Sequence, residues 1–94
     1  MADIVSTPDV LGGEPRIKGR RIGVLHVVNR VLDGDEAPAS VAADFDLDIA
    51  DVYRAVAYYY DHPDEMREWR RRKRATAETA RDEQPDPEEF TRRA

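Results

Sequence analysis

A cluster of basic side chains in the first third of the chain is the feature best suited to chemistry. Between positions 16 and 30 there is no acidic residue, and the basic ones are Arg16, Lys18, Arg20, Arg21 and Arg30. Guanidinium and ammonium groups at this density can neutralise several phosphates of a nucleic acid, and each contact makes binding more salt-dependent. A solvated arginine-rich loop would give the same pattern. We predict DNA contact by this cluster, and the solvated loop remains the alternative.

Catalytic and metal-binding patterns are absent from the sequence. The chain has no cysteine, and its two histidines, His26 and His62, lie far apart, so no thiolate or histidine ligand spacing exists. Carboxylates are plentiful but follow an acidic surface composition, without a nucleophile–base motif or a phosphate-binding loop. We therefore expect a protein that is not an enzyme and that needs no metal or cofactor.

The formal net charge of −5 conceals a second basic segment. Residues 70–74 read Arg-Arg-Arg-Lys-Arg, whereas the last twenty residues are net acidic. The segment can be a second phosphate-binding patch. Equally, it can be a solvated helical face paired with Asp64, Glu65 or Glu68 one turn earlier. No apolar run is long enough for a membrane span, and the N-terminus lacks signal-peptide features, so we expect a cytoplasmic protein.

Residues 47–60 carry the strongest helical pattern. Apolar residues recur at 49, 52, 53, 56, 57 and 60, with Ala55 and Ala57 small enough for another helix to approach closely. Asp48 is a candidate N-cap, and Asp51 adds a favourable charge in the first turn. The pattern places Ile49 and Tyr60 in the core, with Tyr58 or Tyr59 at a dimer or partner surface.

Shorter elements flank this helix. We predict a small β-arm or hairpin with Ile17 and Ile22 facing inward, a helix over 24–32 ended by Gly34, and a short helix over 39–45 opened by Pro38. A further helix restarts at 61–65, where His62 is expected as a capping or turn residue and His26 as a surface or packing residue. The core predicted from these patterns is Val24, Leu25, Val28, Leu32, Val41, Phe45, Ile49, Val52, Val56, Met66 and Trp69.

The expected fold is mainly α: a three-helix, helix-turn-helix-like bundle with a short N-terminal β-arm and a C-terminal helical extension. We divide the chain into a β-arm (1–22), a helical domain (23–69), a basic helical extension (70–84) and an acidic tail (85–94). Ninety-four residues are near the lower limit for an independent core, which favours a homodimer.

Three stretches together resemble the family known as domain of unknown function 433. They are Gly12-Gly13-Glu14-Pro15-Arg16-Ile17-Lys18-Gly19-Arg20-Arg21-Ile22, then Gly34 followed by Pro38 and its helix, and Asp51-Val52-Tyr53-Arg54-Ala55-Val56-Ala57-Tyr58-Tyr59. The chain departs from the pattern at Arg20, usually small and polar, at Gly23, commonly proline, and at Ala37, where a serine cap is expected. The resemblance covers roughly residues 4–69 and implies a dimeric, helix-turn-helix-like domain. Many members look like antitoxins encoded beside a PIN-like ribonuclease.

In a helix-turn-helix protein the first residues of the recognition helix reach base edges. Here that helix would begin with Asp48 and Asp51, which would face phosphates with negative charge, although Arg54 follows one turn later. Three interpretations stay open: readout by this helix including Arg54, a fold that only packs, and DNA contact through the β-arm.

The C-terminal part supplies the candidate partner-binding residues, which are Trp69, Phe90, Arg92 and Arg93. An unstructured segment with one aromatic anchor can fold onto a partner. We hypothesise an antitoxin-like protein that neutralises a ribonuclease toxin and binds operator DNA as a dimer. The alternative is a dimeric protein-interaction module that does not bind DNA.

Overall fold

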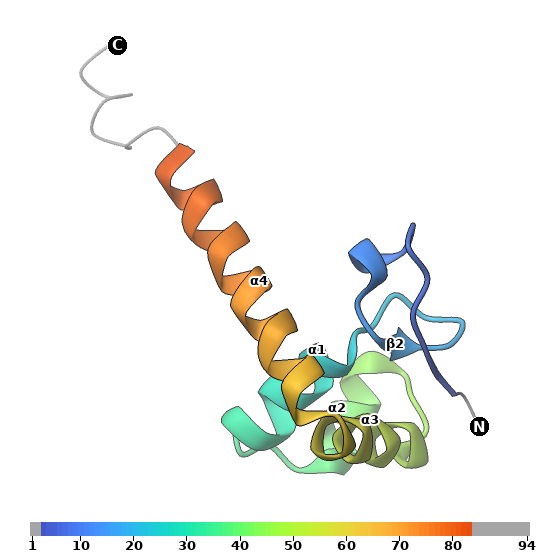
Figure 1. The fold of residues 1–94 in the computed structure, drawn as a ribbon. Helices are drawn as coiled ribbons and strands as arrows, with labels where there is room; N and C mark the ends of the chain where they lie inside the picture. The colour runs from blue at the N-terminus through green and yellow to red at the C-terminus, as the bar shows by residue number, and fades with distance from the viewer. Residues whose placement is uncertain (1–2, 84–94) are drawn as a thin grey trace, which may run out of the picture.

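The computed structural model describes residues 3–83, with side chains through residue 79. It is mainly helical, with a short two-stranded sheet near the N-terminus and a long helix at the other end (Figure 1). The described elements are β1 (Ile4–Val5), η1 (Leu11–Gly13), β2 (Arg16–Ile17), α1 (Val24–Val28), η2 (Asn29–Asp33), α2 (Pro38–Phe45), α3 (Ile49–Asp61) and α4 (Pro63–Glu83). The predicted fold class is confirmed.

The N-terminal arm combines the sheet with a tight turn. β1 and β2 run antiparallel, and Ile4 pairs with Ile17. The chain then turns back on itself, because the Ile17 amide donates to the Ile22 carbonyl oxygen at 3.0 Å. Ile17 is buried and Ile22 packs against the core, so both face inward as predicted.

The first predicted helix changes its winding halfway. α1 is α-helical, but η2 continues it as a π-helical turn. Gly34 ends this segment with φ −89°, so it is not there for left-handed backbone. A Cβ at this position would lie 2.8 Å from the Arg30 carbonyl oxygen, and this close approach is what requires glycine.

α2 and α3 form the helix-turn pair expected from the sequence. Pro38 is the first residue of α2, where its missing N–H costs nothing. Asp46 then adopts a left-handed conformation with φ 55°, which ends α2 and turns the chain towards α3. Asp48 occupies the N-cap position of α3, but its side chain makes no capping hydrogen bond.

The face of α3 that packs against α1 differs from the predicted one. Val52 and Ala55 are fully buried, and the small Ala55 allows the close helix approach expected of it. In contrast, Ile49 is 46% exposed and Tyr60 is 63% exposed, so their assignment to the core was wrong. The apolar residues of α3 occupy two faces, and the sequence pattern does not show which one meets the rest of the fold.

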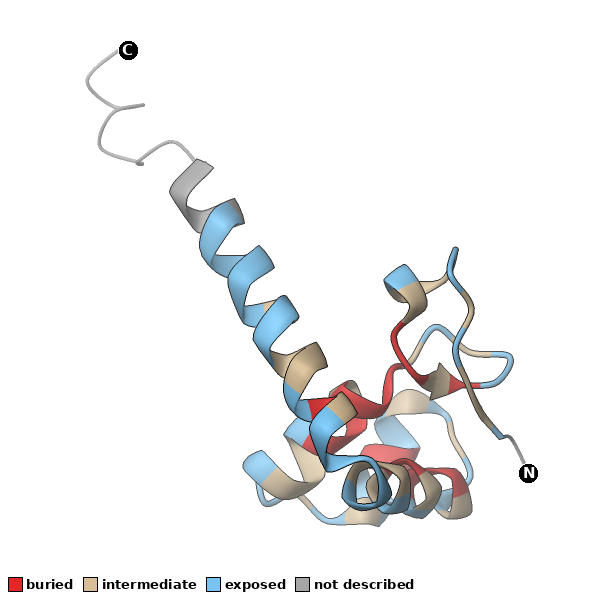
Figure 2. Ribbon diagram, viewed as in Figure 1, coloured by how far each residue is buried: buried red, intermediate tan, exposed pale blue. Residues whose placement is uncertain are grey.

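The core lies between the arm, α1, α2 and α3, and Met66 closes it from α4 (Figure 2). Its buried hydrophobic residues are Ile17, Val24, Leu25, Val27, Val28, Val41, Ala42, Val52, Ala55 and Met66. Leu32, Phe45, Val56 and Trp69 are only partly buried against it. Val27 was missed, because both faces of the short α1 are covered.

α4 extends away from the body, and its residues become exposed soon after Trp69 (Figure 2). The helix is continuous from Pro63 to Glu83, so the predicted boundary between residues 69 and 70 falls inside one helix. No helix in the described part of the chain is long and apolar enough to cross a membrane.

Candidate functional sites: the arm and the projecting helix

Two of the arm's cations hold the fold together. Arg16 donates from Nη1 to the Arg20 carbonyl oxygen at 3.1 Å and from Nη2 to the Thr7 hydroxyl at 3.1 Å. Arg20 donates to the carbonyl oxygens of Asp46 at 2.8 Å and Phe45 at 2.5 Å. These carbonyls lie at the C-terminus of α2, where a cation complements the helix dipole. The acceptors in these hydrogen bonds of both side chains are neutral oxygens, and none of them is a carboxylate.

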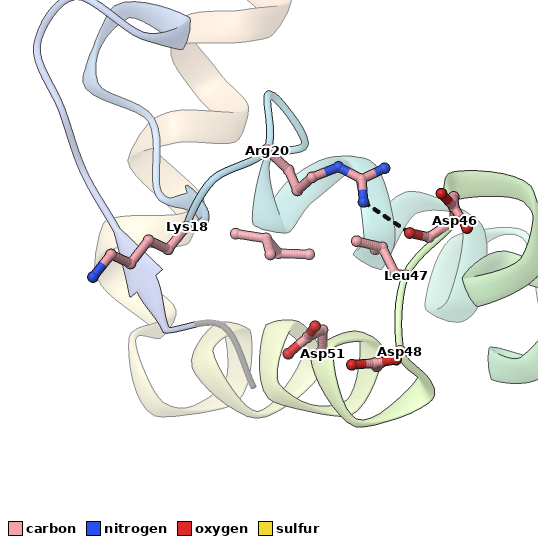
Figure 3. Close-up of a pocket in the computed structure, with 7 residues that line it drawn as sticks. Lys18, Arg20, Asp46, Leu47, Asp48 and Asp51 are labelled. Atoms are coloured by element: carbon pink, nitrogen blue, oxygen red, sulfur yellow. Dashed lines mark hydrogen bonds between the residues drawn. The ribbon is translucent and has the colours of Figure 1, made fainter.

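The other two arm cations point outward. Lys18 and Arg21 are exposed on the turn between β2 and α1. In Figure 3 the Lys18 side chain extends away from the arginine and carboxylates around it. These two side chains are therefore the ones in the arm best placed to meet an external anion.

A pocket of about 450 Å³ separates the arm from the start of α3 (Figure 3). Its lining residues are Ile17, Lys18, Arg20, Asp46, Leu47, Asp48 and Asp51. Cations from the arm occupy one side and carboxylates from the turn and α3 the other. A phosphate here would meet both signs of charge, so the pocket itself is a poor phosphate site.

Arg30 is engaged by carboxylates. Its guanidinium donates to Glu36 at 2.9 and 2.7 Å, forms an ion pair with Asp44 and lies over the Phe45 ring. These contacts raise the pKa of Arg30 and lower that of Glu36, with their mutual hydrogen bond as the largest cause in each case. The structure thus places this predicted DNA-binding residue within an acidic cluster that ties η2 to α2.

Carboxylate side chains surround the start of α3 in the structure, as the sequence indicates. Asp48 is exposed, while Asp51 is 6% exposed. Arg54 is half-buried, and both Asp51 and Arg54 have interaction partners within the protein. This end of α3 offers carboxylates where a recognition helix would approach phosphates.

The basic segment of α4 is partly neutralised by intramolecular pairs. Arg70 pairs with Asp33 at 3.1 Å, and Glu68 accepts from Arg71 and Arg72. The bond from Arg71 is the largest cause that lowers the pKa of Glu68 to about 2. Of the three acidic partners predicted for this segment, Glu68 is the one that pairs with it in the described structure.

Trp69 borders an apolar groove of about 490 Å³ between η1 and α4. The groove is lined by Leu11, Gly12, Glu14, Trp69, Arg72, Lys73, Thr76 and Ala77. Trp69 is half-buried, and the Arg72 guanidinium lies 5.1 Å from its ring centroid. Arg72 and Lys73 at its edge pair with carboxylates of the chain, so the groove offers mainly an apolar surface, which suits a peptide or helix with apolar side chains.

Sequence reasoning missed a polar cluster where the arm, α1 and α4 meet. Glu14 is buried and pairs with Lys73 of α4 at 3.1 Å. His26 lies beside them and accepts the Gly23 amide hydrogen bond at its Nδ1, 2.9 Å away. The only local signal was a histidine three residues after a glycine at a helix start, which resembles a capping box.

Aromatic residues at the junction of α3 and α4 are also part of the fold. Tyr58 donates to Glu65 at 3.0 Å, and burial, reinforced by this bond, raises the pKa of Tyr58 to about 12. The His62 ring stacks on Tyr58 with centroids 3.9 Å apart, at the C-cap of α3. His62 is thus the turn residue expected, whereas Tyr58 and Tyr59 are the half-buried tyrosines instead of Tyr60.

Phe90, Arg92 and Arg93 lie outside the described residues. Among residues 3–83, no group of three histidine or acidic side chains could hold a metal ion.

The described residues therefore form a small, mainly helical domain with an N-terminal β-arm and a projecting helix, α4. Residues 4–59 match the model of the family described as protein of unknown function (DUF433), and the chain belongs to that family. No curated protein and no solved structure matches the chain.

Proposed function

We propose that this chain is an antitoxin-like protein that binds and neutralises a PIN-like ribonuclease and binds operator DNA as a dimer. The observation that carries the proposal is the projecting helix α4, which borders an apolar groove beside Trp69. A helix that leaves its own domain is available for a partner. The acidic C-terminal segment that follows can extend the same contact.

Nuclease inhibition tests this proposal directly. A PIN-like ribonuclease, taken from a neighbouring reading frame where one encodes it, would be titrated with the full chain while RNA cleavage is measured. Ala77→Arg adds bulk and charge in the groove and should weaken inhibition about tenfold or more, because it blocks the apolar contact. Ala75→Arg makes the same change on α4 outside the groove and should have no effect. Equal inhibition by both variants would remove the groove from the proposal.

Operator binding, the second part of the proposal, is supported by the exposed side chains of Lys18 and Arg21. The arm is favoured over α3, since α3 begins with carboxylates. Lys18→Ala with Arg21→Ala should weaken binding to the chain's own promoter and reduce the salt slope by roughly two. Asp48→Asn should leave binding unchanged or strengthen it.

The alternative function is a dimeric interaction module that does not bind DNA, and the acidic start of α3 and the paired Arg30 favour it. Gel-shift titration at low salt separates the two. Nuclease inhibition without promoter binding would select the interaction module.

A further inference from the structure

An apolar stripe runs along the outer side of α3. The large hydrophobic side chains that are exposed among the described residues are Ile49, Tyr53 and Tyr60, at 46%, 56% and 63%, and all three lie on this helix. Exposed hydrophobic side chains scattered singly need no explanation, but a stripe along one helix marks a contact surface. Nothing in the described chain covers it.

The spacing of the stripe is that of a helix–helix seam. With the half-buried Val56, its members follow at i, i+4, i+7 and i+11, the repeat of alternating positions that face a partner helix in a coiled coil. Ala50 and Ala57 lie beside the seam, and their small side chains permit a close approach. Val56 also packs against the core that holds Val52 and Ala55, so the seam runs beside the face of α3 that meets α1.

The seam is complementary to itself when two copies run antiparallel. Such a pairing sets Ile49 against Tyr60 of the second copy and Tyr53 against Val56 of the second copy. Each contact recurs with the copies exchanged, as a twofold interface requires. Antiparallel helices also oppose their dipoles favourably.

The two ends of the seam also fit each other in this arrangement, because one end presents Ile49 and the other a groove. The exposed Asp46 and Asp48 lie beside Ile49. At the opposite end is a groove of about 180 Å³ lined by Tyr59, Tyr60, Pro63, Arg67 and Arg70. Antiparallel pairing brings Ile49 of one copy to this groove on the other, where Arg67 and Arg70 are held by ion pairs within their own copy.

We propose that α3 pairs antiparallel with α3 of a second copy and that this seam is the homodimer interface. The inference rests on the dimer of the proposed function and identifies the surface of each copy through which that dimer forms. It has a consequence for DNA: the outer side of α3 is covered in the dimer, so this helix cannot read a major groove. Operator contact would then come from the two arms.

Disulfide trapping tests the pairing, because the native chain has no cysteine. In the double variant Ile49→Cys/Tyr60→Cys the two positions are about 16 Å apart along one helix, too far for an internal bond. Antiparallel pairing should give a covalent dimer on oxidation. Each single variant should stay uncrosslinked, whereas parallel pairing would crosslink the singles and overturn the proposal.

Sedimentation equilibrium supplies the second measurement. Tyr53→Glu places two unpaired carboxylates in the seam and should weaken dimerisation at least about a hundredfold. Ala75→Glu is the matched control on the exposed part of α4 and should dimerise like the native chain. Circular dichroism checks that both variants are folded.

The outcomes separate the interface from the dimer itself. A native chain that is monomeric at tens of micromolar would overturn both the dimer of the proposed function and the seam. A dimer that survives Tyr53→Glu, or a double-cysteine variant that is dimeric yet uncrosslinked, would overturn the seam alone.

Discussion

The Lys73 ammonium lies 3.1 Å from Oε1 of Glu14, and this pair joins α4 to the residues just before β2. The Glu14 side chain is 6% exposed, while that of Lys73 is 37% exposed. A buried carboxylate is costly without a partner, so the pair fixes the lower part of α4 against the arm. It thereby sets where the helix leaves the body.

Removing the cation should destabilise the fold. Lys73→Met keeps most of the apolar stem but leaves Glu14 buried without its ion pair, at a cost of about 1–3 kcal/mol in the free energy of unfolding. Urea denaturation measures this. Arg74→Met, one position along on an exposed residue, should change stability by less than about 0.5 kcal/mol. Equal effects of the two variants would show that the pair does not stabilise the fold.

Glycine at position 23 is required by the same carboxylate. A Cβ there would lie 2.6 Å from Glu14 Oε1 and 3.1 Å from its Cδ. Gly23→Ala should therefore cost about 1–3 kcal/mol through overpacking. In a Glu14→Ala background the clash is gone, and the cost of Gly23→Ala should largely disappear. If Gly23→Ala lowers the free energy of unfolding equally in both backgrounds, the loss comes from the backbone and not from the clash with Glu14.

His26 should make stability depend on pH. Burial, assisted by Lys73 and opposed by Glu14, lowers the pKa of His26 below its ordinary 6.5. The folded state thus favours the neutral ring, whose Nδ1 accepts the Gly23 amide. This contribution is fully present above pH 6.5 and is lost as the pH falls through the lowered pKa. The difference in stability between native and His26→Gln proteins should shrink from pH 7.5 to about pH 5, and a constant difference would contradict the assignment.

The sequence predicted the helices well because each has its own local signal. Pro38 opens α2, and periodic apolar residues mark α3. It failed at Ile49 and Tyr60, since α3 has apolar residues on two faces and only the tertiary fold selects the inner one.

Side-chain partners distant in sequence were beyond prediction for a similar reason. Arg20 and Arg30 look alike in a basic cluster, yet one binds carbonyl oxygens of a helix end and the other binds two carboxylates. Lys73 finds Glu14 across 59 positions. A charge run shows where cations are, but the fold decides which of them face solvent.

Stability and DNA binding should separate within the arm. Arg20→Ala removes two hydrogen bonds from the C-terminus of α2 and should cost about 1–2 kcal/mol of unfolding free energy. Arg21→Ala, on the exposed neighbour, should leave stability within about 0.5 kcal/mol while weakening promoter binding. Thermal melts and gel shifts on the same two proteins check this. A stability loss for Arg21→Ala that equals that of Arg20→Ala would contradict it.

The C-terminal segment should be needed for nuclease inhibition but not for folding. Residues 81–94 contain one large apolar residue, Phe90, followed by Arg92 and Arg93. A PIN-like nuclease holds its metal with clustered carboxylates, which an arginine can bind in bidentate fashion. Deleting residues 81–94, which removes only the last turn of α4, should therefore leave the fold, the dimer and promoter binding intact while releasing RNA cleavage.

Point variants refine the same prediction. Phe90→Ala should weaken inhibition by loss of its apolar anchor, and Arg92→Ala with Arg93→Ala by loss of the contact with the metal-binding carboxylates. Gln84→Ala is the control: it lies in the deleted segment but before the acidic tail (85–94), and it should inhibit normally. If the chain that lacks residues 81–94 neutralises the nuclease as well as the full chain does, inhibition must come from residues 66–74 of α4. Trp69 beside its groove then becomes the apolar anchor for the nuclease.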